Sequence, residues 1–247
     1  MNTIENNVFT EAWQSLAQQI PLPKAILAIS AHWYVRATAV TAMDHPRTIH
    51  DFSGFPDELF AFQYNAPGSP QLASRVQELL APTHVIADED EWGLDHGTWS
   101  VLAHLYPDAN IPVVQLSIDA TLPISEHISL GRKLAPLANE GVLVLGSGNV
   151  VHNLSRIKWD AGDTGTDWAN RFDIDVAKIM ASEPLQLAGI STHADWPLSA
   201  PTPEHFLPLA YIAGMASETQ ADITRFNYSR TMGSLSMTSY VAQPVTL

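Results

Sequence analysis

The apolar residues of this 247-residue chain fall into two kinds of run that alternate along its length. Short unbroken aliphatic runs predict strands covered on both faces, because a strand with one wet face alternates apolar and polar positions. Apolar residues spaced three or four apart predict helices instead. We expect strands at 25–30, 84–87, 111–118 and 141–145, and a last one around Leu235 and Met237.

Helical spacing fills the intervals between these strands. We expect helices at 10–20, from 69 to about 80, at 96–106, 125–137, 168–179 and 202–215. Thr10 is the predicted N-cap of the first, Ser69 and Pro70 open the second, and Thr202 with Pro203 opens the last. This alternation is typical of an α/β fold with a mainly parallel or mixed central sheet flanked by helices.

Nothing in the pattern suggests a domain boundary. The chain has no repeat, low-complexity tract or linker, so we expect 1–247 to form a single catalytic domain. A proline- and glycine-rich stretch at 44–70 predicts a long loop, and loops of that length in compact domains are usually functional.

Composition and charge remove several classes of function. Twelve basic and 26 acidic residues give a net charge of −14, which disfavours nucleic acid and anionic membranes as partners. The absence of cysteine excludes disulfides, cysteine-ligated zinc, iron–sulfur clusters and a thiol nucleophile. No apolar run reaches the ~18 residues of a membrane span, and the first residues lack the features of a signal peptide. We therefore expect a cytoplasmic protein.

Four histidines stand in contexts that suggest a metal enzyme. His32 follows the strand predicted at 25–30, and His152 follows the strand at 141–145. Open α/β sheets place their chemistry beyond the carboxyl ends of such strands, and imidazole is the commonest ligand of catalytic metals. His205 is expected in the first turn of its helix, where the helix dipole keeps the ring neutral. A buried core histidine at 32 and a simple helix-start residue at 205 remain alternatives.

His96 is the fourth candidate, and it suits acid–base work or a hydrogen bond to substrate. Gly97 would let the backbone approach a ligand closely, and Asp95 could fix the tautomer of the ring. The alternative is an ordinary helix N-terminus with Asp95 as the cap. Asp51 could similarly orient His50, although a simple turn explains that pair better.

The glycine-rich turn at 146–152 allows two interpretations. It resembles a dinucleotide fingerprint, but the third glycine and the later acidic residue are missing. We favour a turn that exposes backbone N–H groups and presents His152. The chain lacks the zinc-protease helix, the nucleophile elbow and the Walker loop.

Seven short motifs in order carry a resemblance to a known family. They are Ser-Ala-His-Trp, Ile-His-Asp-Phe-x-Gly-Phe-Pro, Ala-Pro-Gly-Ser-Pro, Gly-Leu-Asp-His-Gly-Thr-Trp, Tyr-Pro-Asp-Ala-x-Ile-Pro-Val-Val-Gln-Leu-Ser, Gly-Ser-Gly-Asn-Val-Val-His-Asn-Leu and Pro-Thr-Pro-Glu-His. The chain resembles the class III extradiol ring-cleavage dioxygenases, in the branch like 4,5-DOPA extradiol dioxygenase, related to the catalytic subunit of protocatechuate 4,5-dioxygenase. Each motif alone is weak, but together they span the chain.

The resemblance implies an oxidoreductase that opens a catechol, a small aromatic diol, with O2 beside one mononuclear metal per chain. It implies His32 and His205 as metal ligands, His152 as a ligand or acid–base group, and His96 as a second acid–base or substrate-contacting histidine. We expect Fe²⁺ for the chemistry, since zinc is redox-inert, with Zn²⁺ as an alternative occupant. A monomer and a homodimer are both compatible with the sequence.

The chain departs from the family at its first residue. Family members usually begin with a strand ending in Gly-His-Gly-Ser-Pro, whose histidine ligates the metal, whereas this sequence starts at Met1-Asn2. We favour a start codon assigned too late, and expect the chain as written to bind metal poorly and to expose a strand edge. A zinc-dependent hydrolase on the same fold and an inactive metal- or ligand-binding protein are the alternative functions.

Overall fold

The computed structural model describes residues 2–243. They divide into two compact units, the first formed by 2–121 and 136–147 and the second by 122–135 and 148–243. Among residues 2–243, no helix is both long enough and apolar enough to cross a bilayer.

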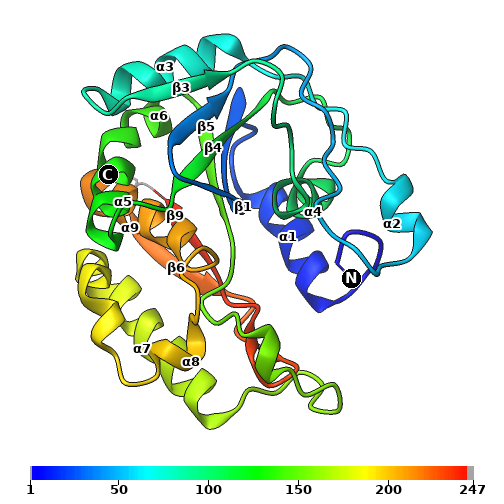
Figure 1. The fold of residues 1–247 in the computed structure, drawn as a ribbon, viewed down its shortest axis with the longest axis vertical. Helices are drawn as coiled ribbons and strands as arrows, with labels where there is room; N and C mark the ends of the chain where they lie inside the picture. The colour runs from blue at the N-terminus through cyan, green and yellow to red at the C-terminus, as the bar shows by residue number, and fades with distance from the viewer. Residues whose placement is uncertain (1, 244–247) are drawn as a thin grey trace. The chain divides into compact units, whose positions relative to one another are not determined.

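A five-stranded mixed sheet forms the centre of the first unit (Figure 1). Its strands are β1 (Ala25–Val35), β2 (Thr38–Thr41), β3 (Val85–Asp88), β4 (Val113–Asp119) and β5 (Val142–Ser147), in the order β3-β2-β4-β1-β5. β1 runs parallel to both β4 and β5, whereas β2 is parallel to β3 and antiparallel to β4. The residues from Ile26 to Ile29 are fully buried, which explains the unbroken aliphatic run. The predicted α/β class with a mixed central sheet is confirmed.

β1 is longer than the sequence predicts, and it is irregular. Its pairing with β4 steps from Ile29 opposite Leu116 to Tyr34 opposite Ile118. The residues between these two pairs have no counterparts on β4, so they form a bulge, a feature that re-aims side chains beside functional sites. His32 therefore lies inside the bulged strand, and its predicted place after a strand that ends at residue 30 is wrong.

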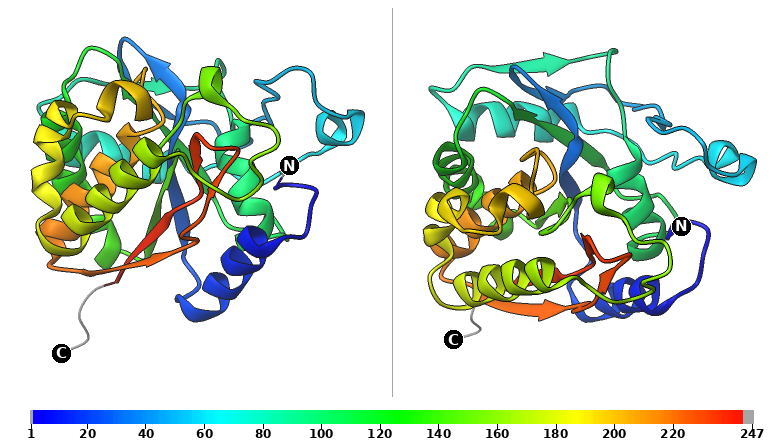
Figure 2. Two further views of the ribbon diagram at one scale, coloured as in Figure 1. Left: turned by 90° about the horizontal axis from the view of Figure 1, so that it is seen from below. Right: turned by 60° about the horizontal axis from the view of Figure 1, so that its bottom comes forward.

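Five helices belong to the first unit. They are α1 (Val8–Gln19), α2 (Asp57–Ala61), α3 (Pro70–Leu80), α4 (His96–Leu105) and α6 (Pro136–Asn139). α4 packs against β1 and β5, α3 against β2 and β3, and α1 against α4. The predicted loop at 44–70 carries the short α2, which stands away from the sheet in both views of Figure 2.

The helix caps agree with prediction at one helix and not at another. Ser69 caps α3, and Pro70 occupies its first position, as expected. The N-cap of α1 is Asn7, whose side chain accepts from the amides of Phe9 and Thr10. Thr10 is the third helical residue, and its hydroxyl oxygen accepts from the amide of Asn7, so its prediction as N-cap is wrong.

The second unit is mainly helical. It contains α5 (Ile124–Leu134), α7 (Asp167–Ser182), α8 (Trp196–Ser199), α9 (Leu207–Thr219), the 3₁₀ segments Leu154–Arg156 and Pro184–Thr192, and the strands β6 (Asp222–Phe226), β7 (Arg230–Thr231), β8 (Leu235–Ser236) and β9 (Ser239–Gln243). α5 and α9 lie side by side (Figure 1). Glycines let these helices approach closely, because a Cβ on Gly131 would lie 2.7 Å from Tyr211 Cα.

Two predicted helices of this part of the chain have different limits. The helix expected at 125–137 ends at Leu134, and α6 begins at Pro136, since proline has no amide hydrogen to continue the first ladder. The helix expected from 203 begins at Leu207. The carbonyl of Pro203 accepts from the amides of Phe206 and Leu207 and closes a turn before the helix. His205 therefore lies in that turn, and its predicted place in the first helical turn is wrong.

Candidate metal site

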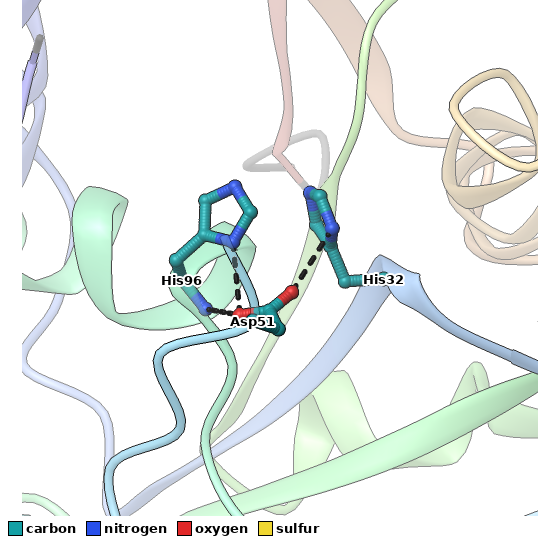
Figure 3. Close-up of side chains that lie close together, drawn as sticks. All are labelled: His32, Asp51 and His96. Atoms are coloured by element: carbon teal, nitrogen blue, oxygen red, sulfur yellow. Dashed lines mark hydrogen bonds and ion pairs between the residues drawn. The ribbon is translucent and has the colours of Figure 1, made fainter. Parts of the chain in front are cut away.

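One carboxylate joins two of the predicted histidines in the first unit. Asp51 Oδ2 lies 3.1 Å from Nδ1 of His32, and Asp51 Oδ1 lies 2.9 Å from Nδ1 of His96 (Figure 3). The two imidazole rings are 3.9 Å apart between centroids and tilted by 52°. His32, Asp51 and His96 each offer a ligand atom within 4.8 Å of the others, so this cluster is a candidate metal site.

Three separate segments bring these side chains together. His32 comes from the bulge of β1, Asp51 from the loop before α2, and His96 is the first residue of α4. The amide of His96 also donates to Asp51 Oδ1 at 3.0 Å, which ties the loop to the start of the helix. The N-terminus of a helix favours an anion, so the carboxylate is well placed there.

Asp51 is ionised in this setting. Burial alone would raise its pKa, but the hydrogen bonds from His32 and His96 outweigh burial and hold the pKa of Asp51 well below its usual range. An ionised carboxylate can only accept hydrogen bonds, so each facing Nδ1 acts as the donor. When either ring is neutral, its single proton is on Nδ1, and the unprotonated Nε2 can bind a metal.

Asp95 is the N-cap of α4, which was the alternative role considered for it in the sequence. Its side chain accepts from the amide of Thr98 at 3.1 Å and caps α4, while Asp51 pairs with the ring of His96. The expectation that Asp95 fixes the tautomer of His96 is therefore wrong. Burial raises the pKa of Asp95 against the opposing effect of hydrogen bonds from Ser30 and Gln115.

Gly97 is in close contact with side chains of β1. A Cβ at this position would meet Ser30 Oγ and would lie 2.9 Å from Cδ2 of the His32 ring. The sequence suggested that Gly97 admits a ligand, whereas the close neighbours are two residues of β1. The glycine is therefore required for α4 to pack beside His32.

Aromatic side chains surround His96. The ring of Phe52 meets it edge-on at 5.3 Å between centroids, and Trp99 lies at 6.3 Å. Trp99 is fully buried and donates its indole N–H to the carbonyl of Ile49 at 2.9 Å. Phe55 and Phe60 are 45% and 39% exposed, and both contact Phe52. The loop before α2 and α2 itself thus place apolar rings next to His32 and His96.

The other two predicted histidines lie together in the second unit. The rings of His152 and His205 stack at 3.5 Å between centroids with an interplanar angle of 6°. Asn149 donates its amide to the carbonyl of Ser236, so its Oδ1 faces Nδ1 of His205 at 3.2 Å. This arrangement makes Nδ1 of His205 the donor and leaves its Nε2 unprotonated.

Two amides of the glycine turn at 146–152, which we expected to be exposed, are paired within the protein. The amide of Asn149 donates to the carbonyl of His205, and the amide of His152 donates to the carbonyl of Ser199. Gly148 is tight against this segment, since a Cβ there would lie 3.1 Å from the carbonyl carbon of His205. These two amides therefore hold the segments of His152 and His205 in place, and they are not available to bind a phosphate.

Asp51 is the member of the candidate metal site that the sequence analysis did not select. The sequence left open that Asp51 orients His50, although it favoured a simple turn for this pair, and His50 places Nε2 2.9 Å from the carbonyl of Phe62. The signal was the Ile-His-Asp-Phe motif inside a long loop, but the sequence alone does not show which histidine a loop carboxylate reaches.

Comparison with known proteins identifies the family. Residues 2–239 match the family described as the catalytic LigB subunit of aromatic ring-opening dioxygenase. The chain is 49% identical over 243 residues to the 4,5-DOPA dioxygenase extradiol of Escherichia coli (strain K12), covering 97% of this chain and 89% of the relative. It is 41% identical over 214 residues to the enzyme of the same name from Beta vulgaris, covering 85% and 79%.

A solved structure agrees with these relatives. The crystal structure of an uncharacterized protein from Escherichia coli K12 matches with a TM-score of 0.84 and 44% identity, covering 97% of this chain and 94% of that one. An α/β fold with a histidine–carboxylate cluster thus defines the class of protein. The chain belongs to the LigB family of aromatic ring-opening dioxygenases, as its motifs suggested.

Proposed function

We propose that this protein is an extradiol dioxygenase that opens a catechol ring with O2, beside rather than between the two hydroxylated carbons. The observation that carries the proposal is the pair His32 and His96 held by Asp51, in a chain that belongs to a ring-opening family. Relatives named 4,5-DOPA dioxygenase extradiol make a DOPA-like catechol the first substrate to test.

The donor set fits a mononuclear metal. Imidazole nitrogens suit Fe²⁺ and also accept Zn²⁺. We propose His32 and His205 as ligands and His152 as a ligand or base, with one ion per chain. A bound Fe²⁺ supplies the redox chemistry that O2 requires, which Zn²⁺ cannot supply.

His96 is proposed as the acid–base group on the substrate side. With its Nδ1 proton directed at Asp51, the neutral ring has its lone pair on Nε2 and can take a proton from a catechol hydroxyl there. The edge of Phe52 beside this ring suits an aromatic substrate, since aromatic pairs favour edge-on and offset contacts.

The stacked pair of the second unit is suited to sharing one positive charge. Two imidazolium rings at 3.5 Å would repel each other, so protonation of one ring disfavours protonation of the other. In the neutral His205 ring the proton is on Nδ1, which faces Asn149, so Nε2 can bind a metal, which supports His205 as the ligand. A metal bound there would occupy that lone pair. His152 is then the member of the pair that can accept a proton.

Oxygen consumption tests the proposal. Protein loaded with Fe²⁺ without air should, on addition of air and DOPA, consume one O2 for each ring opened, because both oxygen atoms enter the product. A yellow product should form in step with the uptake. His96→Gln should lower kcat about 10²–10⁴-fold, while the control His45→Gln, at an exposed position, should match the wild type.

Other outcomes point to other functions. Metal-replete protein that opens no catechol in a panel including DOPA would refute the proposal. Hydrolysis without oxygen uptake would favour a zinc-dependent hydrolase, and metal binding without turnover would favour an inactive binding protein. We further propose that the protein works in the cytoplasm as a monomer or homodimer.

A further inference from the structure

Asp51 contacts both histidines of the first unit through opposite oxygens of one carboxylate. Its Oδ2 lies 3.1 Å from Nδ1 of His32, and its Oδ1 lies 2.9 Å from Nδ1 of His96. We propose that Asp51 is a positioning residue that fixes the tautomers of both rings and is not itself a metal ligand. This inference rests on the metal site proposed above and assigns Asp51 a role within it.

The start of α4 argues against a cation at the carboxylate. Asp51 Oδ1 accepts from the backbone amide of His96 at 3.0 Å in addition to the ring of that residue. The amide hydrogen and the positive end of the helix both face this oxygen. A metal cation placed here would be repelled by the amide hydrogen and by the positive end of the helix dipole. The carboxylate instead accepts the hydrogen bond of the amide and interacts favourably with the dipole. Asp51 therefore holds the Nδ1 side of both rings by hydrogen bonds and does not bind the metal.

The metal would bind His32 at the opposite edge of its ring, where Nε2 lies, and the same edge of His96 would face the substrate. A histidine that ligates a metal through one nitrogen generally donates its other N–H to a carboxylate, a carbonyl or water. Here both rings donate Nδ1–H to the same carboxylate, so in the neutral form of each ring the lone pair is on Nε2. Figure 3 shows the two rings standing on the same side of Asp51.

Sharing one carboxylate couples the two rings. Each ring loses its orienting partner if Asp51 changes, although His32 is on β1 and His96 is on α4. In Asp51→Asn, the side-chain oxygen stays with the backbone amide of His96, which can only donate, so the NH2 group faces His32. The His32 ring is then forced to accept at Nδ1 and to carry its proton on Nε2. That ring can then no longer offer Nε2 to a metal.

Nitrogen-15 NMR of the histidine rings in metal-free protein tests the tautomers directly. The wild type should show His32 and His96 with the proton on Nδ1, assigned by comparison with His32→Gln and His96→Gln. Asp51→Asn should move the proton to Nε2 in at least one of them. The matched control Asp57→Asn removes a carboxylate from an exposed position of the same loop region and should leave both rings unchanged.

Zinc affinity, measured by competition with a chromophoric chelator, provides the second test. Asp51→Asn should weaken Zn²⁺ binding about 10–100-fold, the usual effect of losing a carboxylate that orients a ligand, and Asp57→Asn should leave it unchanged. Wild-type rings protonated on Nε2 would overturn the proposal. Weaker Zn²⁺ binding with unaltered tautomers would also overturn it, because Asp51 would then be a ligand. Neither measurement uses a catechol, so failure of the dioxygenase proposal would be seen separately.

Discussion

Gly97→Ala is the substitution for which the structure gives the sharpest expectation. The new Cβ would lie 2.9 Å from Cδ2 of His32 and closer still to Ser30 Oγ. Ser30 is fully buried and hydrogen-bonds to Asp95, and the ring of His32 is held by Asp51, so neither neighbour can move without losing a bond. The substitution therefore forces atoms into a filled space at the candidate metal site.

The cost follows from opposing contributions. Overpacking a filled site costs about 1–3 kcal/mol, and losing the net benefit of a Ser30 hydrogen bond adds about 1 kcal/mol. Alanine is favoured over glycine in a helix by at most about 1 kcal/mol. The net destabilisation should be about 1–3 kcal/mol, which lowers the melting temperature by about 2–4 °C for each kcal/mol in a chain of this size.

Urea unfolding followed by circular dichroism, together with Zn²⁺ affinity, measures both consequences. Gly97→Ala should unfold at lower urea and bind Zn²⁺ more weakly because the His32 ring is displaced. Gly189→Ala is the control, since no neighbouring atom lies within 4 Å of the added Cβ, and it should change stability by less than about 0.5 kcal/mol. In a Ser30→Ala background the cost of Gly97→Ala should fall, because the nearest clash is gone. Wild-type stability and zinc affinity in Gly97→Ala would refute the reasoning.

Three further predictions concern the second unit. Gly131→Ala should cost about 1–3 kcal/mol in urea unfolding, because the neighbours of the new Cβ are backbone atoms of α9 that cannot rotate away. Arg230→Ala should cost about 3–5 kcal/mol, since it removes the cation 3.0 Å from the fully buried carboxylate of Asp173. A smaller loss would mean that neutral hydrogen bonds suffice there. Arg171 holds the pKa of Asp195 below its ordinary value of about 3.9. The ion pair therefore stabilises the folded state above about pH 4, and this stabilisation is lost as the pH falls further and Asp195 becomes protonated. The difference in melting temperature between wild type and Arg171→Gln should accordingly shrink below about pH 4. A difference that grows in acid would contradict this sign.

The sequence by itself determined the fold class and most of the chemistry-bearing residues. The buried runs of β1 and β4 were visible as apolar stretches, because strands covered on both faces tolerate few polar side chains. The expectation that the stretch at 141–145 is covered on both faces was wrong, because β5 is an edge strand and is only half-buried. Ser69 and Pro70 marked the start of α3, because capping depends on neighbours in the chain. The motifs also pointed to the family that the comparisons identified.

Only the tertiary structure decided which side chains meet. Asp51 lies one residue from His50 and 45 residues from His96, yet it binds His96, because a loop carboxylate is placed by the fold and not by its neighbours. The bulge that carries His32 exists through its pairing with β4, and local propensity gives no sign of it. β2 was missed since Thr38–Thr41 is too short to show a period. Contacts between residues distant in sequence thus determined the geometry of the candidate site, while local pattern determined the elements that bear it.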